Sequence, residues 1–243
     1  MKKPGFLVVI QLSANTRKRY IVVWNKLFAG GLGRKSRLHD HLGHRVTVNR
    51  IVRNGTRAVI SGMGRVVCKS LPLQPWISYD GQAILSKHLN AKSRVLEFGS
   101  GTSTAWYADR CGFLLSHEDS SEWFDLIGKK LGSRQNVCRK LCLSFEDYVF
   151  VSEEHRSSPF DLIMVDGRYR DECVAGAFQL LSNTGILYLD NSDKSMGPES
   201  GNIPLAKSRI LDFAKSNGKR VVTLTDFAPS QFFVSEATIL FNG

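Results

Sequence analysis

The chain has 243 residues, of which 42% are hydrophobic and 23% charged, and its formal net charge is +11. This composition excludes a disordered chain and allows one full globular domain with an additional segment. Every apolar run is shorter than the roughly 18 residues of a membrane-spanning helix, and the first residues do not resemble a signal peptide, so we expect a cytoplasmic protein.

The positive charge is concentrated in residues 1–75, which contain 15 Lys or Arg and one acid, whereas residues 76–243 carry a net charge of −3. The first part is rich in Gly and Arg, and its stretch HRVTVNRIV (44–52) alternates like a β-strand. Two prolines in SLPLQPWISYD (70–80) mark the change of composition. We therefore expect a basic N-terminal extension or small subdomain over 1–75 and a second domain over 76–243.

Histidine and cysteine, the residue types that bind metals most often, give no strong pattern. His39, His41 and His44 form an H-x-H-x-x-H set, but their glycine- and arginine-rich surroundings do not favour a metal site. Five cysteines occur without a C-x-x-C pair. Their odd number and spacing favour neither a disulfide framework nor a structural zinc site, so we expect free thiols, most of them buried.

From residue 77 onward, helical and strand patterns alternate. Helices are expected at 77–89, 103–111, 121–132, 171–185 and 204–218. Strands are expected at 94–99, 113–118, 137–143, 160–167, 186–191, 220–227 and 237–243. Strands that alternate with helices predict a Rossmann-like, doubly wound α/β fold with a mostly parallel seven-stranded sheet and helices on both faces. Such sheets bind ligands at the carboxyl ends of their strands.

A glycine turn follows the first of these strands, in VLEFGSGTSTAWYAD (95–109). Glycines after a strand allow a ligand to approach the backbone, and the helix that follows presents free N–H groups. Glu118 ends the second strand, where a carboxylate can accept hydrogen bonds from two ribose hydroxyls. The third glycine of a nicotinamide-dinucleotide fingerprint is replaced by Thr104. Glu97, before the turn, favours a ligand with a positive charge.

At this point the chain resembles the class I S-adenosylmethionine-dependent methyltransferases over residues 76–243, through EFGSGTST, SHEDSSEW, FDLIMVDG and GILYLDN. The resemblance implies that S-adenosylmethionine is the cofactor. It implies that Glu118 binds the ribose hydroxyls and that SFEDY (144–148) lies near the adenine. The residues implied to contact the cofactor are Glu97, Gly99, Ser100, Gly101, Thr102, Glu118, Ser144, Asp147 and Asp166.

The same sequence partly resembles the catechol and caffeoyl-coenzyme A type of O-methyltransferase. In that group a divalent cation is held by acids after the fourth and fifth strands, which implies Asp166, Asp190 and Asn191 as Mg²⁺ ligands here. Those enzymes carry a lysine three residues after the first aspartate, where this chain has Tyr169. A metal-independent reaction is therefore the alternative.

Without a metal, the sequence leaves open whether Asp166, Tyr169 or His117 is the base. Arg168 or Arg170 would then bind an anionic substrate. Three tryptophans, Trp76, Trp106 and Trp123, are expected to be packing residues.

These patterns predict a methyltransferase that acts on an oxygen of a small molecule or glycan-like acceptor. The basic N-terminus allows an RNA or DNA methyltransferase instead, although no aromatic residues are interleaved with its cations. In the interpretation that we favour, this segment is a small β-rich or helical addition that covers the active site or mediates dimerisation. A non-catalytic interaction module is a further alternative, and the missing third glycine disfavours a nicotinamide-dependent oxidoreductase.

Overall fold

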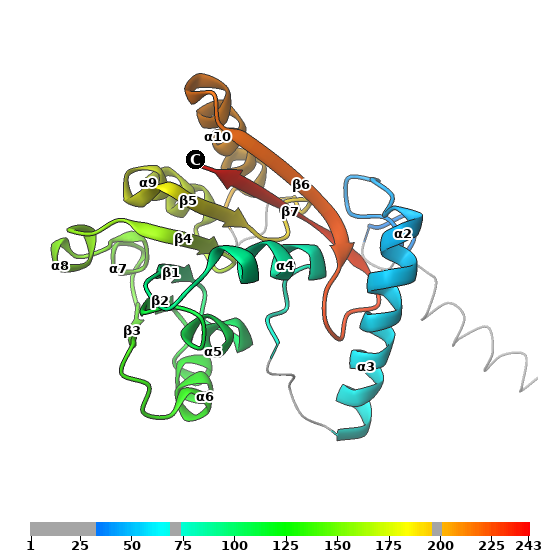
Figure 1. Ribbon diagram of the computed structural model, residues 1–243, viewed down its shortest axis with the longest axis horizontal. Coiled ribbons are helices and arrows are strands. Elements are labelled where there is room, and N and C mark those ends of the chain that lie inside the picture. Colours follow the sequence, from blue (N-terminus) through cyan, green and yellow to red (C-terminus); the bar gives the residue numbers. More distant parts are fainter. Residues whose placement is uncertain (1–32, 69–73, 196–200) are drawn as a thin grey trace, which may run out of the picture.

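A computed structural model describes residues 33–68, 74–195 and 201–243 of the chain. Its centre is a seven-stranded sheet with the strand order β3-β2-β1-β4-β5-β7-β6 (Figure 1). The strands are β1 (Arg94–Phe98), β2 (Phe113–Glu118), β3 (Val137–Leu141), β4 (Phe160–Val165), β5 (Leu181–Leu189), β6 (Arg220–Phe227) and β7 (Val234–Phe241).

Six of the strands run in the same direction, and only β7, which lies between β5 and β6, is antiparallel to its neighbours. The carboxyl ends of β1, β2, β4 and β5 consequently meet at one edge of the sheet, together with the end of β6. This confirms the mostly parallel sheet expected from the sequence.

The two faces of the sheet are covered by different helices. On one face lie α4 (Tyr79–His88), α5 (Thr102–Ala108) and α6 (Ser121–Leu131); on the other lie α7 (Phe145–Val149), α9 (Arg170–Leu180) and α10 (Ile203–Asn217). A short helix, α8 (Glu153–Arg156), precedes β4. In β1, Val95 packs with the first set of helices and its neighbour Leu96 with the second. Because both faces are buried, the central strands are apolar without alternation.

The N-terminal segment is helical, contrary to the strand expected at 44–52. After Thr47 the chain forms α2 (Val48–Arg50), a π-helical stretch η1 (Ile51–Gly55) and α3 (Thr56–Cys68). The alternating valines do not share a buried face, because Val48 is 67% exposed and Val52 is 65% exposed. Burial instead follows helical spacing, with Asn54 and Ala58 nearly inaccessible.

This segment packs against the end of the sheet that carries β6 and β7. Val46 and Ala58 form a small core with Tyr79 of α4, Phe227 at the end of β6 and Val234 at the start of β7. Figure 1 shows α2 and α3 beside the turn that joins these two strands. The segment therefore lies at the same edge of the sheet as the carboxyl ends of the parallel strands.

A second difference concerns the helix expected over 171–185. It ends at Leu180, and β5 starts at Leu181, which pairs with Phe160 of β4. Gly185 was expected to stop the helix, but it lies within β5, whereas Gly132 and Gly218 follow helices with a positive φ of 62°.

Two further observations concern the cysteines and the helices. Of the cysteine side chains that the structure describes, those of Cys111, Cys142 and Cys173 are buried free thiols, as expected. None of the helices in the described part of the chain has the length and apolar character needed to span a bilayer.

Candidate functional site

The turn after β1 brings the backbone of two strands into contact. Gly99 has a φ of +102°, and a Cβ atom at this position would lie 2.7 Å from the backbone of Gly167, which follows β4. Tyr148 closes the other side of Gly167, where its hydroxyl occupies the space of a side chain, and this hydroxyl accepts the N–H of Arg168 at 3.2 Å. Gly99 is therefore required for packing between strand ends as well as for turn conformation.

Glu97 lies beneath this turn and is completely buried. Its carboxylate accepts hydrogen bonds from the hydroxyls of Ser103 at 2.6 Å, Thr104 at 2.7 Å and Ser116 at 2.7 Å. Burial raises the pKa of Glu97 to about 7, and the three hydroxyl donors oppose that rise. Glu97 thus fixes the turn and the first residues of α5, and it is not among the residues that line the cavity described below.

Thr104 explains how the turn is built without a third glycine. Its hydroxyl accepts the N–H of Gly101 at 2.9 Å and donates to Glu97, while its own N–H donates to the carbonyl of Gly101 at 3.2 Å. The threonine side chain therefore connects the turn backbone to the buried acid.

A cavity of about 610 Å³ opens at the carboxyl ends of β1, β2 and β4. This volume is within the range of small-molecule sites, about 300–1,000 Å³. The cavity is lined by Trp76, Ile77, Gly99, Ser100, Gly101, Thr102, Ser103, Glu118, Asp119, Ser120, Trp123, Asp166, Gly167, Arg168 and Arg170.

Two acids at the end of β2 form one wall of this cavity. Glu118 is only 5% exposed, and its Oε1 accepts the N–H of Ser120 at 2.9 Å. Burial raises the pKa of Glu118, while the backbone N–H of Ser120 opposes that rise. The adjacent Asp119 forms an ion pair with Arg168 at 2.9 Å, which joins the ends of β2 and β4 across the cavity.

Two of the three tryptophans lie at this cavity, although Trp123 also packs against the hydrophobic core as expected. Trp76 and Trp123 are in the cavity wall, whereas Trp106 belongs to the hydrophobic core. The indole N–H of Trp123 donates to the carbonyl of Ser100 at 2.5 Å. The residue that fixes this part of the turn therefore comes from α6.

Arg170, rather than a metal site, joins the ends of β4 and β5. Its buried guanidinium donates to the carbonyls of Asp166 at 2.7 Å, Gly167 at 2.9 Å and Asp190 at 2.5 Å. It also contacts the carboxylate of Asp166 at 3.2 Å. Because the guanidinium carries a permanent charge, a cation already occupies the position beside these acids.

The remaining proposed Mg²⁺ ligands do not form an open site. The amide nitrogen of Asn191 donates to the carboxylate of Asp190 at 2.6 Å, and Asp190 is 4% exposed. Burial, followed by the charge of Asp166, raises the pKa of Asp190 well above its usual range. Asp166, Asp190 and Asn191 are thus engaged with Arg170 and with each other, which does not support a hydrated Mg²⁺ ion here, and the Mg²⁺ site stays a prediction.

Two of the three candidate bases lie away from the cavity. His117 is 1% exposed, its Nδ1 contacts the carbonyl of Tyr148 at 2.8 Å, and burial lowers its pKa to about 4. Tyr169 packs its ring edge-on against Phe145 and Tyr148. Neither lines the cavity, whereas Asp166 does, with 39% of its side chain exposed.

Ser144 and Asp147 lie beside β3 in exposed positions and are not part of the cavity wall. Ser144 caps α7 by accepting the N–H of Asp147, whose carboxylate pairs with Lys140 at 3.4 Å. The contact of this region with adenine remains a prediction. Gly99, Ser100, Gly101, Thr102, Glu118 and Asp166 are the predicted cofactor residues that the structure brings together at the cavity.

No protein-family model and no curated protein sequence matches the chain. Solved structures do match. Cofactor-bound Rv0187 from MTB aligns with a TM-score of 0.52 at 16% identity, over 81% of this chain and 98% of that chain. The O-methyltransferase TomG from Streptomyces achromogenes, involved in tomaymycin synthesis and solved in complex with SAM, aligns with a TM-score of 0.51 at 16% identity, over 76% and 88%. The fold is that of the class I S-adenosylmethionine-dependent methyltransferases.

Proposed function

We propose that the protein is an S-adenosylmethionine-dependent methyltransferase whose cofactor binds in the cavity at the ends of β1, β2 and β4. The observation that carries the proposal is the position of Glu118. Its carboxylate lines the cavity at the end of β2, next to the strand that bears the glycine turn. A carboxylate in this place can accept both ribose hydroxyls of a nucleoside.

The other residues of the cavity fit such a cofactor. Gly101 presents backbone without a side chain, and α5 begins at Thr102, so the first N–H groups of that helix lie at the cavity. Trp123 adds an aromatic surface, and Glu118 and Asp119 are acids opposite the turn. This set suits a nucleoside with an attached amino acid and a cationic sulfur.

The cofactor, when bound, supplies a methyl group on an activated sulfonium. The chain therefore has to hold the acceptor in line and accept its proton. Asp166 is the candidate base with an exposed carboxylate in the cavity wall, and Arg170 holds that carboxylate in place. Arg168 lies beside it in the same wall and can contact an anionic group of the acceptor.

The acceptor that we propose is a hydroxyl of a small molecule or glycan. The described arginines of the N-terminal segment support this choice over nucleic acid, because many of them contact the rest of the chain. Arg50 and Arg53 pair with Asp80 of α4, Arg57 lies over the ring of Tyr79, and Arg37 donates to the carbonyl of Phe232. These cations attach the segment to the domain.

The first test is calorimetric titration of the full chain with S-adenosylhomocysteine. We expect micromolar affinity, and a loss of about 100-fold in Glu118→Ala, because two hydrogen bonds to a charged acceptor disappear. Glu122→Ala, which removes an exposed acid in the first turn of α6, is the matched control and should bind as the wild type does. Chelation of Mg²⁺ should leave the affinity unchanged. Tight binding of reduced nicotinamide dinucleotide in place of S-adenosylhomocysteine would overturn the proposal.

The second test follows a radioactive methyl group from the cofactor to mixtures of hydroxylated small molecules, glycans and total RNA. Transfer to the first two classes is the expected result. Transfer to RNA alone would support the proposed cofactor site but contradict the proposed acceptor, which would then be RNA. Cofactor binding without transfer to any class would favour the interaction module.

A further inference from the structure

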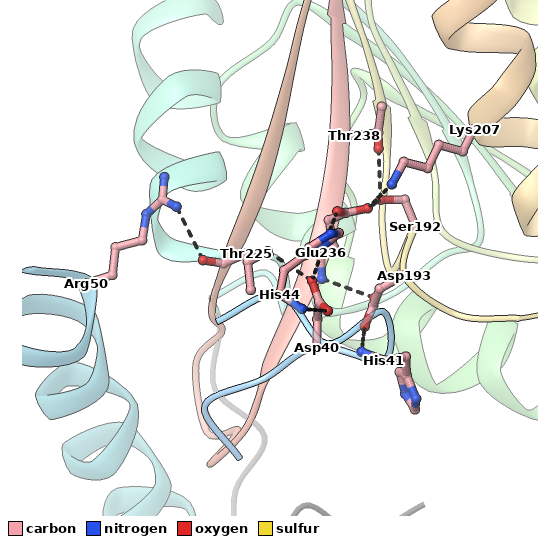
Figure 2. Close-up of polar contacts among 10 residues, drawn as sticks. All are labelled: Asp40, His41, His44, Arg50, Ser192, Asp193, Lys207, Thr225, Glu236 and Thr238. Atoms are coloured by element: carbon pink, nitrogen blue, oxygen red, sulfur yellow. Dashed lines mark hydrogen bonds and ion pairs between the residues drawn. The ribbon is translucent and has the colours of Figure 1, made fainter. Parts of the chain in front are cut away.

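Three side chains from distant parts of the sequence converge outside the cofactor cavity. Asp40 and His44 belong to the loop before α2, and Glu236 belongs to β7 (Figure 2). His44 Nδ1 lies 3.1 Å from Asp40 Oδ2 and 3.4 Å from Glu236 Oε2. One ligand atom from each residue lies within 4.8 Å of the other two.

The hydrogen bonds around these acids leave one carboxylate oxygen, Glu236 Oε2, with a single contact to a histidine nitrogen. Asp40 accepts the N–H of His44 at 2.8 Å and the hydroxyl of Thr225 at 3.0 Å. Glu236 Oε1 accepts the hydroxyl of Ser192 at 2.8 Å and the ammonium of Lys207 at 2.6 Å. Within the described part of the chain, Glu236 Oε2 faces only His44 Nδ1. A ring nitrogen carries at most one hydrogen, so it cannot donate fully to both carboxylates.

Asp40 and Glu236 belong to a larger buried network of charged groups. Asp40, Asp193 and Glu236 are at most 2% exposed, so three carboxylates are buried close together. Asp193 accepts the N–H groups of His41 at 2.9 Å and Glu236 at 3.1 Å, so these acids share one network. The cations near them are Lys207, which pairs with Oε1 of Glu236, Arg34, which interacts with Asp193 and Asp40, and Lys194, which interacts with Asp193. The three carboxylates are thus matched by three cations, and within the described part of the chain none of these cations forms an ion pair with Glu236 Oε2.

We propose that His44 Nδ1, Asp40 Oδ2 and Glu236 Oε2 bind a zinc ion. Two carboxylate oxygens and one imidazole nitrogen are a donor set that zinc accepts, whereas Mg²⁺ and Ca²⁺ prefer oxygen ligands and more of them. His44 is 58% exposed at its side chain, so the ion has a route from solvent and a water molecule can complete a tetrahedron.

The role of this site is structural. Asp40 and His44 precede the first helices of the described chain, and Glu236 lies in the strand between β5 and β6. An ion on all three would fasten the N-terminal segment to the sheet. None of its ligands lines the proposed cofactor cavity, so the two sites are independent.

The test is a zinc titration of the untagged full chain, stripped of metal and followed by a competing chromophoric chelator. We expect one equivalent of zinc to bind and to raise the Tm. His44→Ala should weaken binding at least 10-fold and remove the rise in Tm. Glu236→Gln should do the same. Circular dichroism and Tm without metal would establish that each variant is folded.

His39→Ala is the matched control, because His39 lies in the same loop but its Nδ1 is bonded to Ser36 Oγ at 2.7 Å. This variant should bind zinc as the wild type does. Absence of zinc binding, or equal binding by the wild type and a folded His44→Ala, would overturn the proposal. The three residues would then form only an ion-pair bridge. S-adenosylhomocysteine binding is measured in the same samples, so its failure is seen separately.

Discussion

Gly99 and Gly167 determine how closely the ends of β1 and β4 approach each other. Both strands end at the cavity, and the two glycines are in backbone contact there. The sequence predicted an accessible turn at Gly99 but gave no reason to single out Gly167, because its partner across the sheet is known only once β1 and β4 are paired. The same holds for Trp123, which an amphipathic helix pattern assigns to packing.

We expect Gly99→Ala to reduce the free energy of unfolding by at least about 2 kcal/mol, since a side chain there combines positive φ with a backbone clash. Gly176→Ala is the control, because this glycine is exposed on α9 and a methyl group there would meet no atom within 4 Å. It should stabilise by about 0.5–1 kcal/mol. Urea denaturation measures both, and equal effects of the two substitutions would contradict the packing role of Gly99.

At the scale of elements, β1 and β2 each place an ionisable residue inside the protein. Glu97 in β1 has a pKa raised by burial to about 7, and His117 in β2 has a pKa lowered by burial to about 4. Folding therefore favours the neutral form of both residues. Their effects on stability have opposite dependence on pH.

For Glu97, the folded state binds its proton more tightly than the unfolded state, whose pKa is near 4.5. The contribution of protonated Glu97 to the free energy of unfolding is fully present below pH 4.5. It falls by on the order of 3 kcal/mol as the pH rises to about 7. The wild type should therefore lose stability relative to Glu97→Gln over this interval. Denaturant unfolding from pH 4.5 to 8 measures the difference, and parallel curves would contradict it.

For His117, the unfolded state binds its proton more tightly, with a pKa near 6.5. The contribution of neutral His117 to the free energy of unfolding is fully present above pH 6.5. It falls by on the order of 3 kcal/mol as the pH falls to about 4. Relative to His117→Gln, the wild type should become less stable as the pH falls from 6.5 to 4. A difference that does not change with pH would place the ring in contact with solvent.

The elements also show where sequence patterns predict structure and where they do not. The strand and helix order from β1 to β7 followed from apolar runs and glycine stops, because each central element is buried through its own residues. The helix over 48–68 could not be predicted in this way, because its apolar residues are divided between a buried face and solvent. The zinc ligands could not be grouped from the sequence either, because only the sheet order brings Glu236 beside His44.

At the scale of the whole molecule, the N-terminal segment is attached through buried polar contacts. Asn54 is fully buried, and its amide donates to both oxygens of Asp226 at 2.9 and 2.8 Å and to Asp80 at 3.1 Å. Asp226, at β6, is itself inaccessible and also accepts the N–H of Asp80. These contacts predict that the segment and the sheet unfold together.

We expect a single thermal transition for the full chain and a loss of about 2–4 kcal/mol in Asn54→Ala, because a buried carboxylate loses its donor. Arg57→Ala is the control, since Arg57 is exposed and its contact with the ring of Tyr79 should contribute at most about 1 kcal/mol. Calorimetry measures both. Two separate transitions, or equal losses in the two variants, would show that the segment is an independent unit.

The position of β7 has a consequence for synthesis of the chain on the ribosome. This strand follows the other six in sequence, yet it lies between β5 and β6. Until it emerges, β5 and β6 have no partner on the sides that face each other, and strands with open edges are prone to pair with other chains. The N-terminal segment also lacks part of its packing surface until this strand is made, because it contacts Val234 and Glu236 of β7. The nascent protein therefore exposes aggregation-prone strand edges until β7 has been synthesised.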